Sequence, residues 1–389
     1  MALEWKPDPR LAWRQVSRDL VPAVLNADGG RLVPWGLHTE ARYLREALTI
    51  DPRRQALSEG LLPNGIEVGR HVPLSSLVFH AANFPSYIGA PLESDGSVWA
   101  GRATFGWNDW TVDMDQSPDD SRLRQELRVG YGHALTHVGR LRRQDGSTFS
   151  VGRGLRCTEA LHSFLGFVRG GWCGPALLSG LDGDDRVVWQ QWSVRLVSPA
   201  QPRPSIFMAS DPELLARLAP GFMARLNGPA WGETYRRAVA LFVAANRGVP
   251  IEIGIILAQS ALELLAWSTF VRSGRMTPAA FKDWSAADQI RSLLDRAHIS
   301  RSVPPSLVAL ASLSGASAPG DGPERVAYVR NRIVHPPRNT SLRKLSSPEL
   351  VDAWRLMLYY AELILLKLAR YKGQIHSRID DHPTLVPWR

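Results

Sequence analysis

The spacing of hydrophobic residues divides the chain into two parts with different periodicities. As far as about Pro199, short runs of alternating apolar and polar residues are separated by turn residues, which is typical of β-strands. Beyond Ser205, apolar residues recur at intervals of three and four over longer segments, which is typical of α-helices. The pattern predicts an α+β protein with two domains: a mainly β N-terminal domain over residues 1–199 and an all-α bundle over residues 206–389.

Turn residues mark individual elements in the first part. The dipeptide Asp145-Gly146 supplies the positive φ that a tight hairpin turn needs, and Gly170-Gly171 is a typical helix end. We therefore predict a strand and turn within 102–115, a hairpin from 134–143 and 147–151, a helix over 155–168, and a second hairpin within 177–197.

The two parts are joined by a proline-rich segment. Residues 198–205 contain three prolines, which stiffen the chain and cannot donate to a strand ladder, so we expect an interdomain linker at residues 200–205. After it, helices are predicted at 211–226, 231–246, 250–272, 285–298, 304–314, 322–335 and 347–371. The last of these has a strong start, because Ser346 can cap the helix and Glu349 lies in its first turn.

Composition narrows the class of protein. A chain of 389 residues exceeds the size at which single cores usually stop growing, which agrees with two domains. The 46 Lys and Arg residues against 37 Asp and Glu give a net charge of +9, which favours polyanionic partners. The two cysteines, Cys157 and Cys173, cannot form a disulfide framework, so buried thiols in a reducing compartment are expected.

No targeting segment is evident. The start of the chain, MALEWKPDPR, has early charges and prolines where a signal peptide would be apolar. The most apolar segments, 251–271 and 350–368, are interrupted by charged residues, so we interpret them as core helices and not as membrane spans. A cytoplasmic protein without membrane contact is expected.

The candidate chemistry lies in residues 330–337, which read RNRIVHPP. Prolines cannot continue a helix, so the preceding helix should end near His335. Asn331 and His335 are four residues apart and share one helix face, and Arg330 flanks them. A guanidinium, an amide and an imidazole can thus converge on one phosphate. The structural alternative is an arginine paired with a carboxylate and a histidine that caps its own helix.

This motif and its context resemble a known family. Arg330, Asn331 and His335, placed between the apolar helix ILAQSALELLAW (256–267) and a long terminal helix, are similar to the R-x(4–6)-H motif of HEPN domains, and in particular to the Apea-like HEPN group of bacterial anti-phage proteins. The resemblance covers about the last 180 residues. It implies a HEPN-like helix bundle. Many members of that superfamily are metal-independent ribonucleases that work as dimers, so it also implies this activity.

The resemblance assigns roles at the site. His335 would act as general base or acid on the ribose 2′-hydroxyl, Arg330 would stabilise the charge on the phosphate, and Asn331 would orient the imidazole or bind phosphate. Products would be a 2′,3′-cyclic phosphate and a 5′-hydroxyl. No metal or other cofactor is expected. One protomer offers one imidazole, so a homodimer formed through the helical domain would supply both a base and an acid.

Polar residues outside the motif triad are further candidates. Glu263 and Gln259 lie on a polar stripe of the apolar helix and would support the site, with an ion pair between Glu263 and Arg330 as the structural hypothesis. Four basic residues in or after the motif could hold an RNA backbone, although solvated charges are the commoner explanation: Arg332, Arg338, Arg343 and Lys344.

Two further patterns occur in the N-terminal part. His133 and His137 would lie roughly 13 Å apart in a strand, so we reject a shared zinc ion. Tryptophans at positions 107, 110, 189 and 192 could stack on bases, but packing in a β domain is the commoner use.

The leading hypothesis is a metal-independent endoribonuclease of anti-phage defence. Its N-terminal domain would sense a phage-derived trigger and restrain or activate the helical domain, which would cleave tRNA or another structured RNA. Two alternatives stay open. One is a HEPN module that binds RNA or nucleotides, or dimerises, without cleaving. The other is a ligand-binding β module joined to a helical oligomerisation domain.

Overall fold

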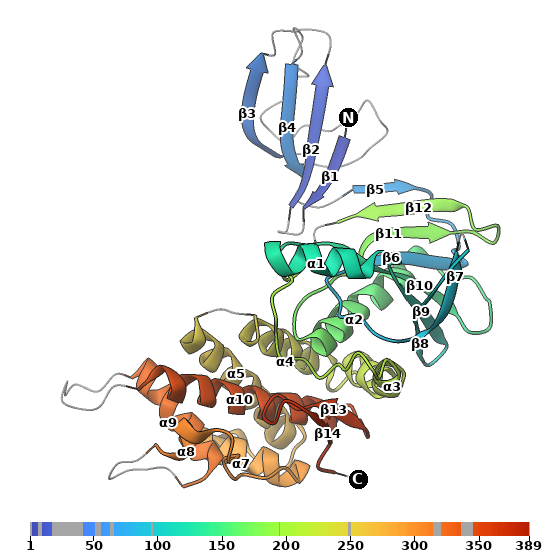
Figure 1. Ribbon diagram of the computed structural model, residues 1–389. Helices are drawn as coiled ribbons and strands as arrows, with labels where there is room; N and C mark the ends of the chain where they lie inside the picture. The colour runs from blue at the N-terminus through green and yellow to red at the C-terminus, as the bar shows by residue number, and fades with distance from the viewer. Residues whose placement is uncertain are drawn as a thin grey trace.

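The computed structural model describes residues 2–6, 10–17, 42–50, 56–62, 66–94, 96–193, 195–247, 250–313, 320–335 and 345–388, with side chains from residue 67 onward except at positions 94 and 97. The backbone before residue 63 forms a four-stranded antiparallel sheet in the order β1-β2-β4-β3 (Figure 1). Its strands are β1 (Ala2–Lys6), β2 (Arg10–Ser17), β3 (Arg42–Ile50) and β4 (Ala56–Leu62).

An eight-stranded antiparallel sheet follows, in the order β5-β12-β11-β6-β10-β9-β8-β7. Its strands are β5 (Ile66–Gly69), β6 (Ser76–Ala82), β7 (Ala90–Ser94), β8 (Ser97–Trp107), β9 (Trp110–Gln116), β10 (Leu135–Arg143), β11 (Ala176–Leu181) and β12 (Val187–Trp192). Two helices accompany this sheet, α1 (Asp120–Gly130) and α2 (Val151–Arg169). Buried and part-exposed residues alternate along β9, as a strand with one face on a core requires.

The rest of the chain is helical. It contains α3 (Glu213–Asn227), α4 (Gly232–Ala245), α5 (Ile251–Trp267), a π-helical turn (Ser268–Arg272), α6 (Pro278–Lys282), α7 (Ala286–Ala297), α8 (Val308–Ala311), α9 (Gly322–Val334) and α10 (Ser347–Leu368). A short hairpin of β13 (Gln374–His376) and β14 (Pro383–Leu385) follows α10. The predicted α+β class, with a mainly β region before a helical one, is confirmed.

One predicted hairpin is wrong in its second half. Residues 147–151 were expected to form a strand, but only Phe149 makes an isolated bridge, to Leu74, and α2 starts at Val151. Ser150 causes the change, because its side chain accepts a hydrogen bond from the Arg153 N–H and caps the helix. The helix expected over 304–314 is likewise reduced to the single turn of α8.

A continuous aromatic core joins the sheet to the helices. The ring of Phe164 on α2 lies 5.5 Å from Phe105 on β8 and 5.3 Å from Phe222 on α3, measured between ring centroids. Phe222 in turn lies 5.1 Å from Tyr235 on α4. In Figure 1 the helices α2 and α3 lie between the sheet and the other helices. The two parts of the chain therefore share buried surface, and do not meet only through a connector.

The proline-rich connector is also held in place. The Asn246 side chain donates to the carbonyls of Gly170 and Pro204, at 2.8 and 2.9 Å, and Ser205 Oγ donates to the Val168 carbonyl at 2.6 Å. These contacts fix residues 204–205 against the ends of α2 and α4. The exact limits of the two domains, residues 1–199 and 206–389, remain a prediction.

Three of the four tryptophans considered for base stacking serve packing. Trp107, Trp110 and Trp189 are buried, so they are not available as a surface on which bases could stack, whereas Trp192 on β12 is partly exposed. Both cysteines are buried and free, as expected, and burial raises the pKa of each thiol to about 12. Neither thiol is therefore set up as a nucleophile.

Among the residues that the structure describes, one helix, at 251–272, is long and apolar enough to cross a membrane by length and composition, and 56% of the relevant window is buried within the protein. It packs against α4, α7, α9 and α10. These contacts favour its interpretation as the central helix of a bundle.

The buried histidines of the β region predict a pH dependence of stability. Burial lowers the pKa of His80, His137 and His162, and His137 is shifted furthest. Below about pH 6.5 the unfolded chain binds protons that the folded chain excludes. The free energy of unfolding should therefore fall as the pH falls from 7 to 5, by up to about 1.4 kcal/mol per pH unit for His137 alone. Urea unfolding at a series of pH values measures this slope.

A variant isolates the contribution of His137. Its ring packs against Phe84 and Tyr87, and its Nε2 atom is buried without a hydrogen-bond partner, so His137→Phe preserves the packing and removes the titration. The variant should show a shallower slope by up to one proton. Identical slopes for the two proteins would contradict the prediction.

Candidate functional site

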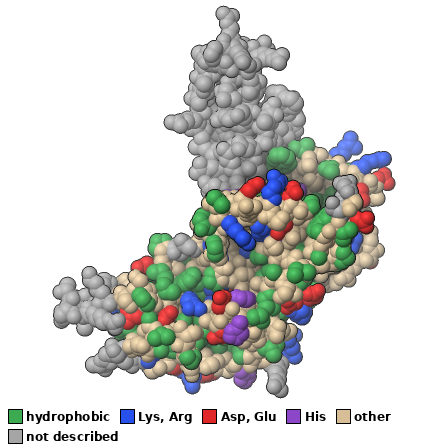
Figure 2. Space-filling model, in the orientation of Figure 1, with side chains coloured by type: hydrophobic (Ala, Val, Ile, Leu, Met, Phe, Trp, Pro, Cys, Tyr) green, Lys and Arg blue, Asp and Glu red, His purple; other side chains and the backbone are tan. Residues whose placement is uncertain are grey.

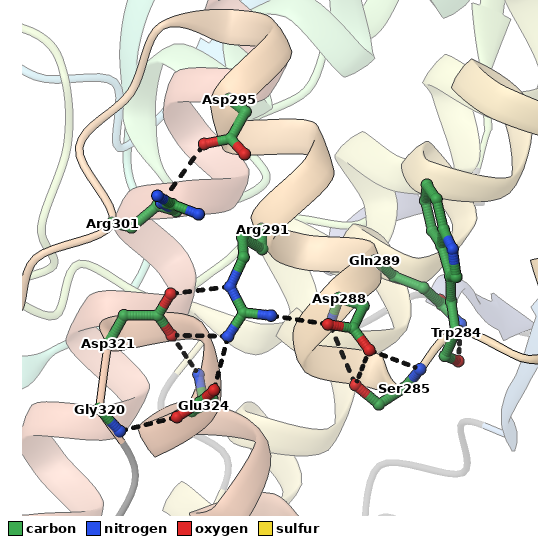
Figure 3. A network of polar contacts seen from close by, with 10 residues as sticks. All are labelled: Trp284, Ser285, Asp288, Gln289, Arg291, Asp295, Arg301, Gly320, Asp321 and Glu324. Atoms are coloured by element: carbon green, nitrogen blue, oxygen red, sulfur yellow. Dashed lines mark hydrogen bonds and ion pairs between the residues drawn. The ribbon is translucent and has the colours of Figure 1, made fainter.

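Helix α9 carries the motif, and its first turn is fixed by a polar network (Figure 3). Asp321 caps the helix by accepting a hydrogen bond from the Glu324 N–H at 3.1 Å. Arg291 on α7 reaches both carboxylates, with 2.9 Å from Nε to Asp321 and 2.7 Å from Nη2 to Glu324. The hydrogen bond to Asp321 raises the pKa of Arg291, so this cation is permanent. The network holds the start of α9 against α7.

The buried face of α9 sets the orientation of the motif. Val326 and Val329 are fully buried, and Ala327 is nearly so, within a bundle that includes α5, α7 and α10. Because 3.6 residues make one turn, this face leaves Asn331 and His335 on the solvent side and Arg330 at its edge. The exposed position of the motif thus follows from the packing of the preceding two turns.

The three motif residues meet at the last turn of α9. Arg330 Nη1 donates to Asn331 Oδ1 at 3.3 Å, and the His335 backbone N–H donates to the Asn331 carbonyl at 2.8 Å. His335 ends the helix, with φ −123° and ψ 73°, as the prolines after it predict. The three residues therefore share one helix end, and the convergence of their side chains on one phosphate remains a prediction.

Two features bear on the structural alternative for this motif. Among the described residues, no carboxylate lies within ion-pair distance of Arg330, and its buried Nε atom has no hydrogen-bond partner. The His335 side chain is exposed and makes no hydrogen bond to any residue that the structure describes. Within the described residues, Arg330 thus has no carboxylate partner and the His335 side chain does not cap the helix.

The ion pair expected between Glu263 and Arg330 does not form. Gln259 Nε2 donates instead to Glu263 Oε1 at 2.6 Å, along the same face of α5. Gln259 is buried, its Oε1 atom lacks a partner, and Glu263 is half-buried. The pairing fails because i and i+4 side chains on one helix meet readily, whereas contact with Arg330 depends on how α5 and α9 are rotated.

The basic residues assigned to RNA binding divide into two groups. Arg332 lies on α9 with its guanidinium carbon 6.0 Å from the centre of the Tyr328 ring. The other three lie outside the described residues: Arg338, Arg343 and Lys344. No group of three or more His, Cys, Asp or Glu that could hold a metal is found in the described part of the chain. Metal independence remains a prediction.

Sequence reasoning missed the residues that position α9. Arg291 was not singled out, because its partners lie 30 and 33 residues away in sequence. The helix start was detectable, since Asp321 is followed by Pro323 and Glu324, a typical N-terminal pattern. The burial of Gln259 could also have been expected from its place within an apolar run.

Two family models match this chain. Residues 69–203 match the YopA central domain, and residues 228–386 match the YopA C-terminal domain. The first match covers the eight-stranded sheet with α1 and α2 but omits β5 up to Val68, and the second covers α4 to the terminal hairpin but omits α3.

A curated relative agrees with these matches. The chain is 24% identical over 342 residues to the SPbeta prophage-derived uncharacterized protein YopA of Bacillus subtilis (strain 168), which covers 85% of this chain and 76% of the relative. No solved structure matches the chain.

Proposed function

We propose that this chain is a cytoplasmic, metal-independent endoribonuclease of the HEPN type that acts in defence against phage. One observation carries the proposal: Arg330, Asn331 and His335 lie together at the exposed end of α9, and no described carboxylate neutralises the arginine. A guanidinium without a described carboxylate partner, at the same helix end as an accessible imidazole, suits a phosphodiester with a neighbouring hydroxyl.

The reaction would need only these groups and the RNA itself. His335 takes the proton from a ribose 2′-hydroxyl, and the 2′-oxygen attacks the adjacent phosphorus. The bond from phosphorus to the 5′-oxygen breaks, and that oxygen receives a proton from an acid. Arg330 stabilises the negative charge on the phosphate, and Asn331 binds phosphate or orients the imidazole. The ends formed are a 2′,3′-cyclic phosphate and a 5′-hydroxyl.

The first test is cleavage of labelled RNA by the purified full-length chain, with and without EDTA. We expect the same rate in both and a cyclic phosphate at the new 3′ end. Loss of cleavage in EDTA would exclude the proposed mechanism. RNA that is bound but never cut, under any condition, would favour the alternative of an RNA-binding module without catalysis. Transfer RNA is the first substrate to try, because the net charge of +9 favours a polyanion.

A dimer would supply the acid. In a two-fold assembly each His335 could face its copy, so that one imidazole acts as base and the other as acid. Exposed apolar side chains are available at the motif and on the next helix, since Val334 on α9 and Val351 on α10 are each 39% exposed. Such positions suit the edge of a contact between helical domains.

We expect sedimentation to show a dimer whose dissociation on dilution parallels the loss of activity per chain. Val351→Asp should weaken both together, because it places a charge in the proposed contact. The matched control is Val129→Asp on α1, an 85% exposed valine of the β region. A monomer that is equally active per chain at every concentration would refute the composite site.

The role in defence rests on resemblance and on the relative. The printed name of that relative says that it derives from a prophage. A resident prophage gains when its host stops a second phage, and an RNase that is held inactive until infection would serve this purpose. In this proposal the β region receives the phage-derived trigger, and the shared aromatic core provides a physical link from it to the helices.

A further inference from the structure

A cavity of about 470 Å³ lies among the helices, away from the residues of the motif. It forms where the π-helical turn after α5 meets the C-terminal ends of α7 and α10. Its size falls within the range of small-molecule sites. The inner wall is aliphatic, because Leu293, Ala297 and Ile364 line it and each is at least nine-tenths buried, with Leu368 beside them.

One polar side chain in this wall lacks a partner. Thr269 lines the cavity and is 6% exposed, and its Oγ1 atom is buried without a hydrogen bond. An unsatisfied buried hydroxyl costs about 1–3 kcal/mol. Thr269 lies in the π-helical turn, and such turns are frequent at functional sites. Rotation of the Thr269 side chain about its Cα–Cβ bond would offer this hydroxyl to a ligand atom in the cavity.

The solvent side of the cavity is cationic. Arg296 and His298 are exposed and Lys367 is half-buried, and all three line the opening. Lys367 lies over the Trp388 ring, with its Nζ atom 5.1 Å from the ring centre. Neither Arg296 nor Lys367 forms an ion pair with a carboxylate of the described residues. Two positive charges, those of Arg296 and Lys367, thus lie at the edge of an aliphatic cavity, and no described carboxylate neutralises them.

We propose that this cavity binds a small organic anion with an aliphatic body, an alkyl carboxylate or an alkyl phosphate. The head group would pair with Arg296 and Lys367, one head-group oxygen or ester oxygen would bond Thr269, and the chain would fill the aliphatic wall. A nucleotide fits the aliphatic wall of this cavity less well. Its base carries several donors and acceptors, whereas the inner wall offers the single Thr269 hydroxyl, and unpaired polar atoms would weaken binding.

The test is calorimetric titration of the full-length chain with butanoate, hexanoate and octanoate. Burial of each methylene should strengthen binding about fourfold until the cavity is full, which is the fold-change that its transfer from water predicts. Octyl phosphate, compared with octanoate, distinguishes the two head groups. Octanol, which lacks the charge, and adenosine monophosphate, which lacks the aliphatic body, should both bind at least about tenfold more weakly.

Variants separate this site from general surface adsorption. Arg296→Ala and Lys367→Ala should each weaken octanoate binding by about tenfold or more, and Lys367→Arg should retain it. Arg237→Ala, on an exposed arginine of α4, is the matched control and should change nothing. The proposal is overturned if neither octanoate nor octyl phosphate binds at millimolar concentration, if adenosine monophosphate binds better than both, or if the double variant of Arg296 and Lys367 binds as well as the unchanged chain. Because the readout is binding, these outcomes do not depend on RNA cleavage.

Discussion

The His335→Ala protein should cleave RNA at least about a hundredfold more slowly than the unchanged chain, because proton transfer by a positioned side chain contributes a factor of 10²–10⁴. Arg330→Ala should cost a similar factor through the loss of charge stabilisation on the phosphate. The side chain of His335 is exposed and lies at the end of α9, so its removal should leave the fold intact. Initial rates on one labelled RNA, with circular dichroism of each variant, measure both effects.

Matched controls decide whether the loss is specific to the motif. His382→Ala removes another exposed histidine, and Arg237→Ala removes an arginine whose partner is the exposed Glu233. Both variants should cleave at the rate of the unchanged chain. Full activity in the His335→Ala protein would exclude the proposed base. Unfolding of the His335 and Arg330 variants would instead mean that the motif is structural.

The Arg378→Met protein should be about 3–5 kcal/mol less stable than the unchanged chain, since it leaves a buried carboxylate without its cation. Arg378 lies in the C-terminal segment and donates to Glu362 of α10, at 2.7 Å from Nη2 to Oε2, and both side chains are 1% exposed. Its Nη1 atom also donates to the Asn246 side chain, which holds the end of α2. The midpoint and slope of urea unfolding measure the loss.

The pH dependence of this loss has a definite sign. Burial raises the pKa of Glu362, although Arg378 opposes the shift. Without Arg378 the carboxyl would be protonated more readily in the folded chain, so the cost of the substitution should be smaller near pH 5 than near pH 8. A cost that is constant over this range would contradict the assignment of the penalty to an unpaired charge.

Two comparisons test whether the burial of the pair matters. The double variant of Glu362→Leu with Arg378→Met should recover most of the loss, because apolar residues of similar volume replace a buried ion pair at little cost. Arg237→Ala breaks a pair that is about two-thirds exposed on both sides and should change stability by less than about 1 kcal/mol. Equal effects for the buried and the exposed arginine would refute the argument.

Local chemistry made much of this fold predictable. The start of α10 was expected from Ser346 and Glu349, and the structure forms that capping box, with each side chain bonded to the backbone of the other residue. The end of α2 was expected at Gly170, which adopts a left-handed φ of 73°. Such signals are reliable because all of their partners lie within four residues.

The shared position of the motif residues at one helix end was predictable for the same reason. Asn331 and His335 share a face in any α-helix, and the prolines after His335 end it, so the sequence alone placed Arg330, Asn331 and His335 together. The ion pair of Glu263 with Arg330 was wrong, because it required the relative rotation of two helices. No spacing within one segment determines that rotation.

Only the tertiary structure decided the contacts between segments that are distant in sequence. Arg291 fixes the start of α9 from 30 residues away, Arg378 crosses from the terminal segment to Glu362, and Phe222 joins the helices to the core of the sheet. Periodicity reports which face of an element is buried, and the sequence determined those faces for most helices. It does not report which other face lies opposite, because the free energy of that choice is a sum over packing and ion pairs that form only when the whole chain has folded.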